Sequence, residues 1–207
     1  MSAASMLAAA DAVLVDLDGT LVDSTAPVRR VWIAFAQRHG LDPEEVERFA
    51  HGRPSRESVR ALTPDADLEA ESNAIEAAEI ADTDGLVSLP GAAQLLSGDR
   101  PLAIVTSCST ALATVRLQTA RLPIPEVLVS SDGLERGKPD PTCFLIAAQR
   151  LGVDPSRCVV IEDAPAGITA GRAAGALVIA LRTTHADAEL GDADVIADDI
   201  AALLPAG

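Results

Sequence analysis

The chain has 207 residues, of which 48% are hydrophobic, so it is long enough for one core domain with a modest insertion. Its formal net charge of −15 at pH 7 leaves no basic surface for nucleic acid or an anionic membrane, and an aromatic content of 2% leaves few platforms for stacking bases. No apolar run approaches the roughly 20 residues that a membrane-spanning helix needs.

The first ten residues are small and mostly apolar, and they carry no basic residue, so we expect a loose tail rather than a signal peptide. The next element is a predicted strand at residues 12–15, whose uninterrupted apolar run is typical of a strand buried on both faces of a parallel sheet. Residues two apart point the same way in an extended chain, so Asp16 and Asp18 share one side. Two acids at the mouth of a buried strand need either a cation or a set of hydrogen-bond donors to compensate them, and a hard divalent metal such as Mg²⁺ is the simplest compensation.

The pattern changes to helices after Ser24. Apolar residues recur at helical spacing from Val28 to Ala36, and further helices are predicted to begin near residues 42 and 55 and to run over residues 67–81. Residues 23–87 are therefore expected to form a separate, small, all-helical domain inserted after the first strand. Residues 1–22 and 88–207 would then form the core domain.

From residue 89 onward, apolar strands alternate with helices. The predicted strands cover residues 102–105, 127–129, 159–161, 177–181 and 195–196. This alternation predicts an α/β fold with a doubly wound parallel sheet, in which ligands bind beyond the carboxyl ends of the strands. Four apolar runs end in polar groups, which points to one site: Asp16 and Asp18, Thr106 and Ser107, residues 130–132, and Glu162 and Asp163.

Lysine usage singles out one further position. Of the 16 basic residues, 15 are arginine, and the one lysine, Lys138, lies between Gly137 and Pro139. This indicates a position where a compact ammonium is needed and a planar guanidinium does not serve. The alternative is a single lysine that survived compositional drift.

Four ordered segments resemble the motifs of the haloacid dehalogenase superfamily. The segment D-L-D-G-T-L-V-D-S at residues 16–24 resembles the first motif of its phosphatase and phosphomutase branch, and Thr106 with Ser107 resembles the second. Lys138-Pro139 resembles the third motif, and residues 161–168 resemble the fourth. The resemblance implies a Rossmann-like core with a helical cap, and a mechanism that passes through an aspartyl-phosphate.

The resemblance also implies roles for these residues. Asp16 would be the nucleophile and Asp18 the general acid and base, while Thr106 and Lys138 would complete the catalytic set. Phosphoryl transfer needs such a nucleophile, neutralised phosphate oxygens and a proton for the leaving group. We expect Mg²⁺ to be the metal and no other cofactor to bind. The expected metal ligands are Asp16, Asp18, Glu162 and Asp163, and the expected phosphate-binding residues are Thr106 and Ser107.

A second group of candidate substrate residues lies in the predicted cap. The segment H-G-R-P-S-R-E-S at residues 51–58 is similar to a cap loop of fungal 2-deoxyglucose-6-phosphate and glycerol-3-phosphate phosphatases, and more loosely to that of β-phosphoglucomutase. We therefore predict that His51, Gly52, Arg53 and Arg56 contact substrate. The alternative is a solvated helix start whose arginines pair with Glu57 and its neighbours.

The leading hypothesis is a Mg²⁺-dependent phosphatase for a small sugar or polyol phosphate, of the glycerol 3-phosphate or hexose or deoxyhexose 6-phosphate type. One alternative is a β-phosphoglucomutase-like mutase, but Val28 occupies the position where that enzyme carries a histidine. Another is a catalytically silent phosphometabolite-binding module, which the intact catalytic set disfavours. The three cysteines lack metal-ligand spacing and are typical of a reducing cytoplasm, where we expect a monomer or weak homodimer.

Overall fold

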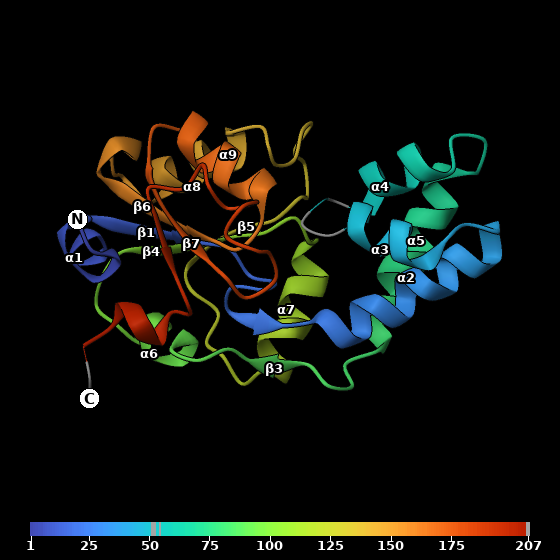
Figure 1. Cartoon of the computed structure of the whole chain (residues 1–207), viewed down its shortest axis with the longest axis horizontal. Helices are drawn as coiled ribbons and strands as arrows, with labels where there is room; N and C mark the ends of the chain where they lie inside the picture. The colour runs from blue at the N-terminus through green and yellow to red at the C-terminus, as the bar shows by residue number, and fades with distance from the viewer. Residues whose placement is uncertain (51–52, 54, 206–207) are drawn as a thin grey trace.

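The computed structural model describes residues 1–50, 53 and 55–205, and its centre is a six-stranded parallel sheet (Figure 1). The strand order is β5 (Val127–Val129), β4 (Leu102–Val105), β1 (Ala12–Val15), β6 (Cys158–Glu162), β7 (Leu177–Leu181) and β8 (Val195–Ala197). Neighbouring strands pair in parallel throughout. The predicted doubly wound, Rossmann-like α/β fold is therefore confirmed.

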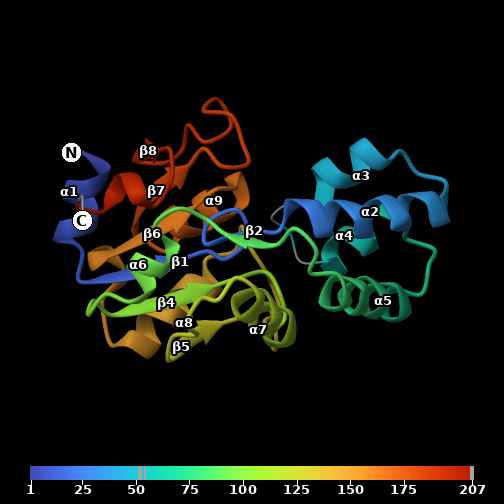
Figure 2. The same ribbon diagram turned by 90° about the horizontal axis from the view of Figure 1, so that it is seen from below.

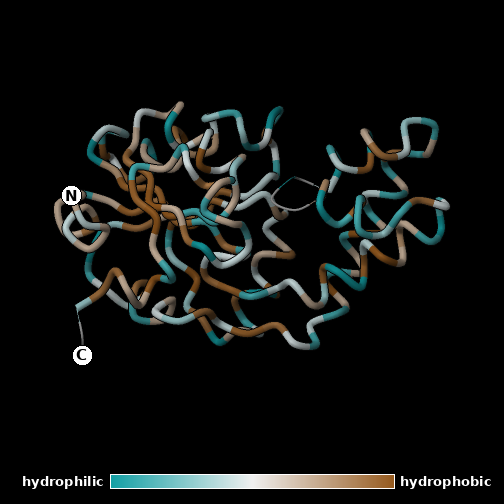
Figure 3. The backbone as a smooth tube through the Cα atoms, viewed as in Figure 1, coloured by the Kyte–Doolittle hydropathy of each residue, from teal (hydrophilic) through white to brown (hydrophobic). Residues whose placement is uncertain are grey.

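Helices cover both faces of this sheet. One face packs against α1 (Ala3–Ala9), α6 (Ala92–Leu96) and α7 (Thr110–Thr119), and the other against α8 (Thr142–Leu151) and α9 (Pro165–Ala173). Two 3₁₀ helices, η1 (Pro155–Arg157) and η2 (Ala201–Leu203), complete the core. All four residues of β1 are fully buried, and they alternate between the two apolar layers. Figure 3 shows the apolar strands gathered inside the core.

Four helices form a separate cluster, called here the helical unit: α2 (Thr25–His39), α3 (Pro43–Ala50), α4 (Ser55–Leu62) and α5 (Leu68–Ala81). It has an apolar core of its own, in which Trp32 packs edge-on against Phe35, with Val46, Val59 and Ile75 around them. The unit lies to one side of the sheet in Figure 1. Its assignment as a cap with boundaries at residues 23 and 87 stays a prediction.

Two short strands that were not predicted from the sequence join the helical unit to the core. β2 (Val22–Asp23), where the chain enters the unit, pairs antiparallel with β3 (Val87–Ser88), where the chain leaves it. Figure 2 shows the two linking segments side by side. Strands of two residues have too little sequence pattern to be read locally, because the pairing joins segments far apart in the chain.

The amino terminus also differs from the predicted loose tail. Residues 3–9 form α1, and Met6 and Leu7 are buried against the sheet. Ser2 caps this helix by accepting a hydrogen bond from the Ser5 amide at 3.2 Å. Across the described residues, no helix combines the length and the apolar character needed to cross a membrane.

Candidate active site

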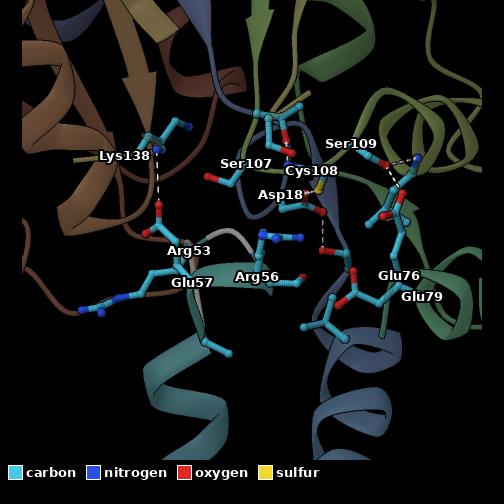
Figure 4. A pocket seen from close by; sticks show the side chains of 18 of the residues that line it. Asp18, Arg53, Arg56, Glu57, Glu76, Glu79, Ser107, Cys108, Ser109 and Lys138 are labelled. Atoms are coloured by element: carbon cyan, nitrogen blue, oxygen red, sulfur yellow. Dashed lines mark hydrogen bonds between the residues drawn. The ribbon is translucent and has the colours of Figure 1, made fainter. Parts of the chain in front are cut away.

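A cavity of about 390 Å³ lies between the carboxyl ends of the central strands and the helical unit. Figure 4 shows Arg53, Arg56 and Glu57 on one side of it and Ser107 and Lys138 on the other. His51 and Gly52, which were predicted to contact substrate, lie outside the described residues. All the other predicted site residues line this cavity: Asp16, Asp18, Arg53, Arg56, Thr106, Ser107, Lys138, Glu162 and Asp163.

The Lys138 ammonium lies at the centre of the buried part of the site. Its Nζ donates to Asp16 Oδ1 at 2.5 Å, to Glu162 Oε1 at 2.6 Å and to the Val105 carbonyl oxygen at 3.0 Å. Three acceptors around one point suit the three donors of an ammonium, which explains why this position carries the sole lysine. The prediction that Lys138 balances the charge of Asp16 matches this geometry, and Glu162 is a second partner that the sequence did not indicate.

Burial sets the protonation of these groups. Burial raises the pKa of Asp16 well above its usual range, Lys138 lowers it, and Glu162 and Asp163 raise it further. Burial likewise raises the pKa of Glu162, with Lys138 opposing it. Burial alone would lower the pKa of Lys138, but the two carboxylates raise it more, so the ammonium stays charged. A nucleophilic Asp16 must be ionised, but burial disfavours its ionised form. A further positive charge beside Asp16, such as a bound cation, would therefore stabilise the carboxylate.

The donor set fits a divalent cation. Asp16, Glu162 and Asp163 are buried, and each offers a carboxylate oxygen within 4.8 Å of the others, with one ammonium to balance three acids. Carboxylate oxygens are the ligands that hard cations such as Mg²⁺ prefer. Thr20 Oγ1 donates to Asp163 Oδ1 at 3.2 Å and so orients that carboxylate. The choice of Mg²⁺, and ligation by Asp18, stay predictions.

Both carboxylate oxygens of Glu162 accept hydrogen bonds from the protein. Its Oε1 accepts from Lys138, and its Oε2 accepts from the backbone amides of Asp163 at 3.0 Å and Ala164 at 3.1 Å. These contacts suit a role in holding Lys138 and shaping the loop after β6. Direct ligation of a metal by Glu162 stays a prediction.

Gly167 makes room for the Glu162 carboxylate, because a Cβ at this position of α9 would overlap it. Gly167→Ala should therefore displace Glu162 from Lys138 and destabilise the protein by about 1–3 kcal/mol, although alanine favours helices. Chemical denaturation and activity assays measure both effects. Gly98→Ala is the matched control, since its Cβ would meet no atom closer than 3.4 Å. Equal behaviour of the two variants would contradict the packing role of Gly167.

Thr106 and Ser107 follow β4, where phosphate contacts are predicted. Thr106 is buried, and its Oγ1 accepts from the Cys108 amide at 3.1 Å, which fixes the loop between β4 and α7. Ser109 then caps α7 by accepting from the Leu112 amide at 3.2 Å. Hydroxyl groups and a helix amino terminus therefore face the cavity beside Asp16, as phosphate binding requires.

Asp18 is held from two sides. Ser24 Oγ donates to its Oδ1 at 2.6 Å, and the Cys108 thiol donates to its Oδ2 at 3.0 Å. Arg116 Nη1 also donates to Oδ2, at 2.5 Å. The predicted proton-transfer group is thus fixed by contacts from three segments.

Arg116, which was not predicted from the sequence, lies on α7 with 5% of its surface exposed. Its second partner, Glu79 of α5, is 7% exposed and was also missed. A signal does exist for each: Arg116 follows buried Leu112 by four residues, and Glu79 follows buried Ile75 by four. A charged residue on the apolar face of a helix indicates a buried partner, but it does not identify that partner.

The two arginines predicted to contact substrate, Arg53 and Arg56, differ in their contacts. The Arg53 guanidinium stacks over the Phe49 ring, with its Cζ 4.4 Å from the ring centroid. Arg56 Nη2 lies 3.7 Å from Glu69 Oε2, so it pairs with an acid from a neighbouring helix. Both residues border the cavity, and their contact with substrate stays a prediction.

The site and fold agree with comparisons to known proteins. A family model described as haloacid dehalogenase-like hydrolase matches residues 10–175, which is most of the chain. The chain belongs to the haloacid dehalogenase-like hydrolase family. This haloacid dehalogenase-like chain is 46% identical over 190 residues to hexitol phosphatase A from Escherichia coli (strain K12), covering 88% of each protein.

Two further comparisons extend this finding. The chain is 32% identical over 208 residues to 2-deoxyglucose-6-phosphate phosphatase 2 from Saccharomyces cerevisiae (strain ATCC 204508 / S288c), covering 88% of this chain and 84% of that one. The crystal structure of a hydrolase from Pseudomonas syringae superposes with a TM-score of 0.84 at 26% identity, covering 94% and 95% of the two chains. The family resemblance indicated by the four motifs is confirmed.

Proposed function

We propose that this haloacid dehalogenase-like hydrolase is a metal-dependent phosphatase that hydrolyses small sugar or polyol phosphates through an aspartyl-phosphate on Asp16. The observation that carries the proposal is the buried Asp16–Lys138 pair beside Glu162 and Asp163, at the carboxyl ends of parallel strands. Such a group combines an oxygen nucleophile with positive charge and a cation site, which are the requirements of phosphoryl transfer.

In the first half-reaction, an Asp16 carboxylate oxygen attacks phosphorus. We assign the attack to Oδ2, because Lys138 engages Oδ1. The bond between phosphorus and the sugar oxygen breaks as the new Asp16–phosphorus bond forms. Asp18 gives its proton to the departing oxygen, so the sugar or polyol leaves as a neutral alcohol.

In the second half-reaction, Asp18 removes a proton from water, and the resulting oxygen attacks phosphorus. The Asp16–phosphorus bond breaks, which restores the Asp16 carboxylate and releases inorganic phosphate. Thr106 and the amino terminus of α7 offer donors to the phosphate oxygens, and Lys138 offsets negative charge throughout.

Asp16 and Asp163, with Glu162 nearby, would hold a divalent cation, for which we propose Mg²⁺. When bound, such an ion neutralises charge on the phosphate and the nucleophile. Lys138 and the hydroxyl of Thr20 orient the carboxylates that would receive it.

Support for a sugar or polyol substrate comes from the other wall of the cavity. Ser72, Asn73 and Glu76 of α5 face it and suit hydroxyl groups, and its volume falls within the range of about 300–1,000 Å³ of small-molecule sites. The relatives described above are, by name, a hexitol phosphatase and a 2-deoxyglucose-6-phosphate phosphatase. Val28 also lines the cavity and has no titratable group for the proton transfers of a mutase, which favours hydrolysis.

The proposal is tested by measuring free phosphate released from hexitol phosphates, hexose and deoxyhexose 6-phosphates and glycerol 3-phosphate. Each assay is run with Mg²⁺ and with a chelator. We expect release from at least one substrate that falls by about 10²-fold or more in chelator and returns when Mg²⁺ is restored. Phosphosugar isomerisation without free phosphate would instead favour a mutase. Binding without turnover would favour a silent sensor.

A further inference from the structure

Arg116 connects the proposed proton-transfer group to the helical unit. Its Nη1 donates to Asp18 Oδ2 at 2.5 Å, and its Nη2 donates to Glu79 Oε2 at 3.0 Å. Asp18 belongs to the loop after β1, Arg116 to α7 of the core and Glu79 to α5 of the helical unit. Figure 4 shows Glu79 close to Glu76 and Ser109, where the helical unit approaches α7. One guanidinium therefore bridges both parts of the molecule.

The charges of this bridge are buried, so they lose the hydration that they would have in water. The side chains of Arg116 and Glu79 are 6% and 5% exposed, so neither charge is solvated by bulk water. Burial alone would lower the pKa of Arg116, but Asp18, Cys108 and Glu79 raise it above its usual value, so the guanidinium stays charged. A buried arginine without partners is strongly unfavourable, and here it has one carboxylate on each side.

Glu79 is itself anchored within the helical unit. It lies on α5 four residues after Ile75, and Ile75 packs in the apolar core of that unit. Other polar contacts also join the two parts: Ser109 Oγ donates to Glu76, and the Gly137 amide donates to Glu57 Oε1 at 3.3 Å. Of these three connections, the one through Arg116 also reaches Asp18.

We propose that Arg116 is a positioning residue that couples the seating of the helical unit to the orientation of the Asp18 carboxyl group. The inference rests on the proposed function, since it assigns proton transfer to Asp18. When Glu79 holds Arg116, the guanidinium has a fixed place from which to hold Asp18 Oδ2. Without Glu79, Arg116 loses its outer partner, and Asp18 loses its alignment with the leaving oxygen.

The leaving group provides the test. Phenyl phosphate and p-nitrophenyl phosphate have similar shapes, but phenolate is a much poorer leaving group and depends more on a proton from Asp18. For a two-step enzyme, kcat/KM reports the half-reaction that expels the leaving group. A defect in positioning Asp18 should therefore lower kcat/KM more for phenyl phosphate, whereas a general loss of folded enzyme lowers both equally.

We expect Arg116→Met to lower kcat/KM by about 10²-fold for phenyl phosphate and by about tenfold or less for p-nitrophenyl phosphate. Glu79 does not touch Asp18. Glu79→Met should therefore also lower kcat/KM more for phenyl phosphate than for p-nitrophenyl phosphate, but by only about tenfold for phenyl phosphate. Arg116→Lys retains a donor and Glu79→Gln retains an acceptor, so each should recover part of the loss. Asp18→Asn, which removes the proton-transfer group itself, shows how much more kcat/KM falls for phenyl phosphate than for p-nitrophenyl phosphate when that group is lost.

Arg38→Met is the matched control. Arg38 of α2 donates to Glu71 of α5 at 2.9 Å, a pair that lies wholly within the helical unit. This variant should keep both kcat/KM values within about twofold of wild type, as expected for an exposed ion pair. If Arg116→Met fails to fold, the Glu79 variants still measure the coupling.

Equal losses on the two aryl phosphates in the Glu79 and Arg116 variants would overturn the inference. So would a bias in Arg116→Met that is absent from Glu79→Met, because the link to the helical unit would then have no effect. Failure of the proposed function looks different: the wild type would cleave aryl phosphates but no sugar or polyol phosphate. A wild type inactive on every phosphate ester would contradict both.

Discussion

Asp16→Asn is expected to reduce phosphate release by about 10³-fold or more, because the amide cannot form the acyl-phosphate that the carboxylate forms. The fold should persist, since Lys138 keeps Glu162 as an ion-pair partner. Steady-state phosphate release, together with circular dichroism of the variant, separates lost chemistry from lost structure.

The control for this variant is Asp99→Asn. Asp99 is exposed and lies just before β4, at the amino-terminal end of that strand, whereas the cavity lies at the carboxyl ends of the strands. It should retain wild-type activity. Substantial turnover by Asp16→Asn would mean that another group attacks phosphorus.

Lys138→Met should have the second large effect, because it removes the ammonium from between Asp16 and Glu162. Removing one partner from a buried ionic cluster costs about 3–5 kcal/mol in the free energy of unfolding. Activity should fall by about 10²-fold or more, since the charge that offsets the nucleophile and the phosphate is lost. Urea denaturation and phosphate release measure the two losses.

The stability loss in Lys138→Met should depend on pH. Lys138 lowers the pKa values of Asp16 and Glu162 against the effect of burial, so without it the folded state holds these protons to higher pH. The variant's folded state then binds more protons than its unfolded state, and its stability falls as pH rises. The difference from wild type should be largest near neutral pH and shrink toward about pH 4, where unfolded carboxylates also protonate.

Lys138→Arg is the informative companion variant. The guanidinium keeps the charge, but its planar donors do not match the three acceptors around Nζ in a space that is closed to solvent. We expect it to recover stability only in part. Full recovery of activity by Lys138→Arg would show that the shape of the ammonium is unimportant and would contradict our explanation of the sole lysine.

Much of the core and of its catalytic edge could be predicted because the information is local. Apolar β-branched runs mark buried strands, and the polar residues that follow them, such as Asp16 and Thr106, collect at one edge of any parallel sheet. Lys138 was found through its contrast with the arginines elsewhere in the chain. These features need no knowledge of which segments meet in space.

What the sequence left out depends on contacts between distant segments. The pairing of β2 with β3 joins residues 22 and 88, and the packing of α1 depends on the sheet that it covers. The Arg116 bridge joins three elements, so neither its partners nor its nearness to Asp18 is visible in the spacing of α7. Such contacts depend on how segments far apart in the chain pack together.

The most direct test of the central claim is to identify the residue that carries the phosphoryl group during turnover. Asp18→Asn, supplied with metal and p-nitrophenyl phosphate, should accumulate the intermediate, because water is then poorly activated. After an acid quench and digestion, mass spectrometry should find one phosphoryl group on the peptide that contains Asp16, and none when Asp16→Asn is added to the variant. A phosphoryl group on any other residue would contradict the mechanism proposed for this site.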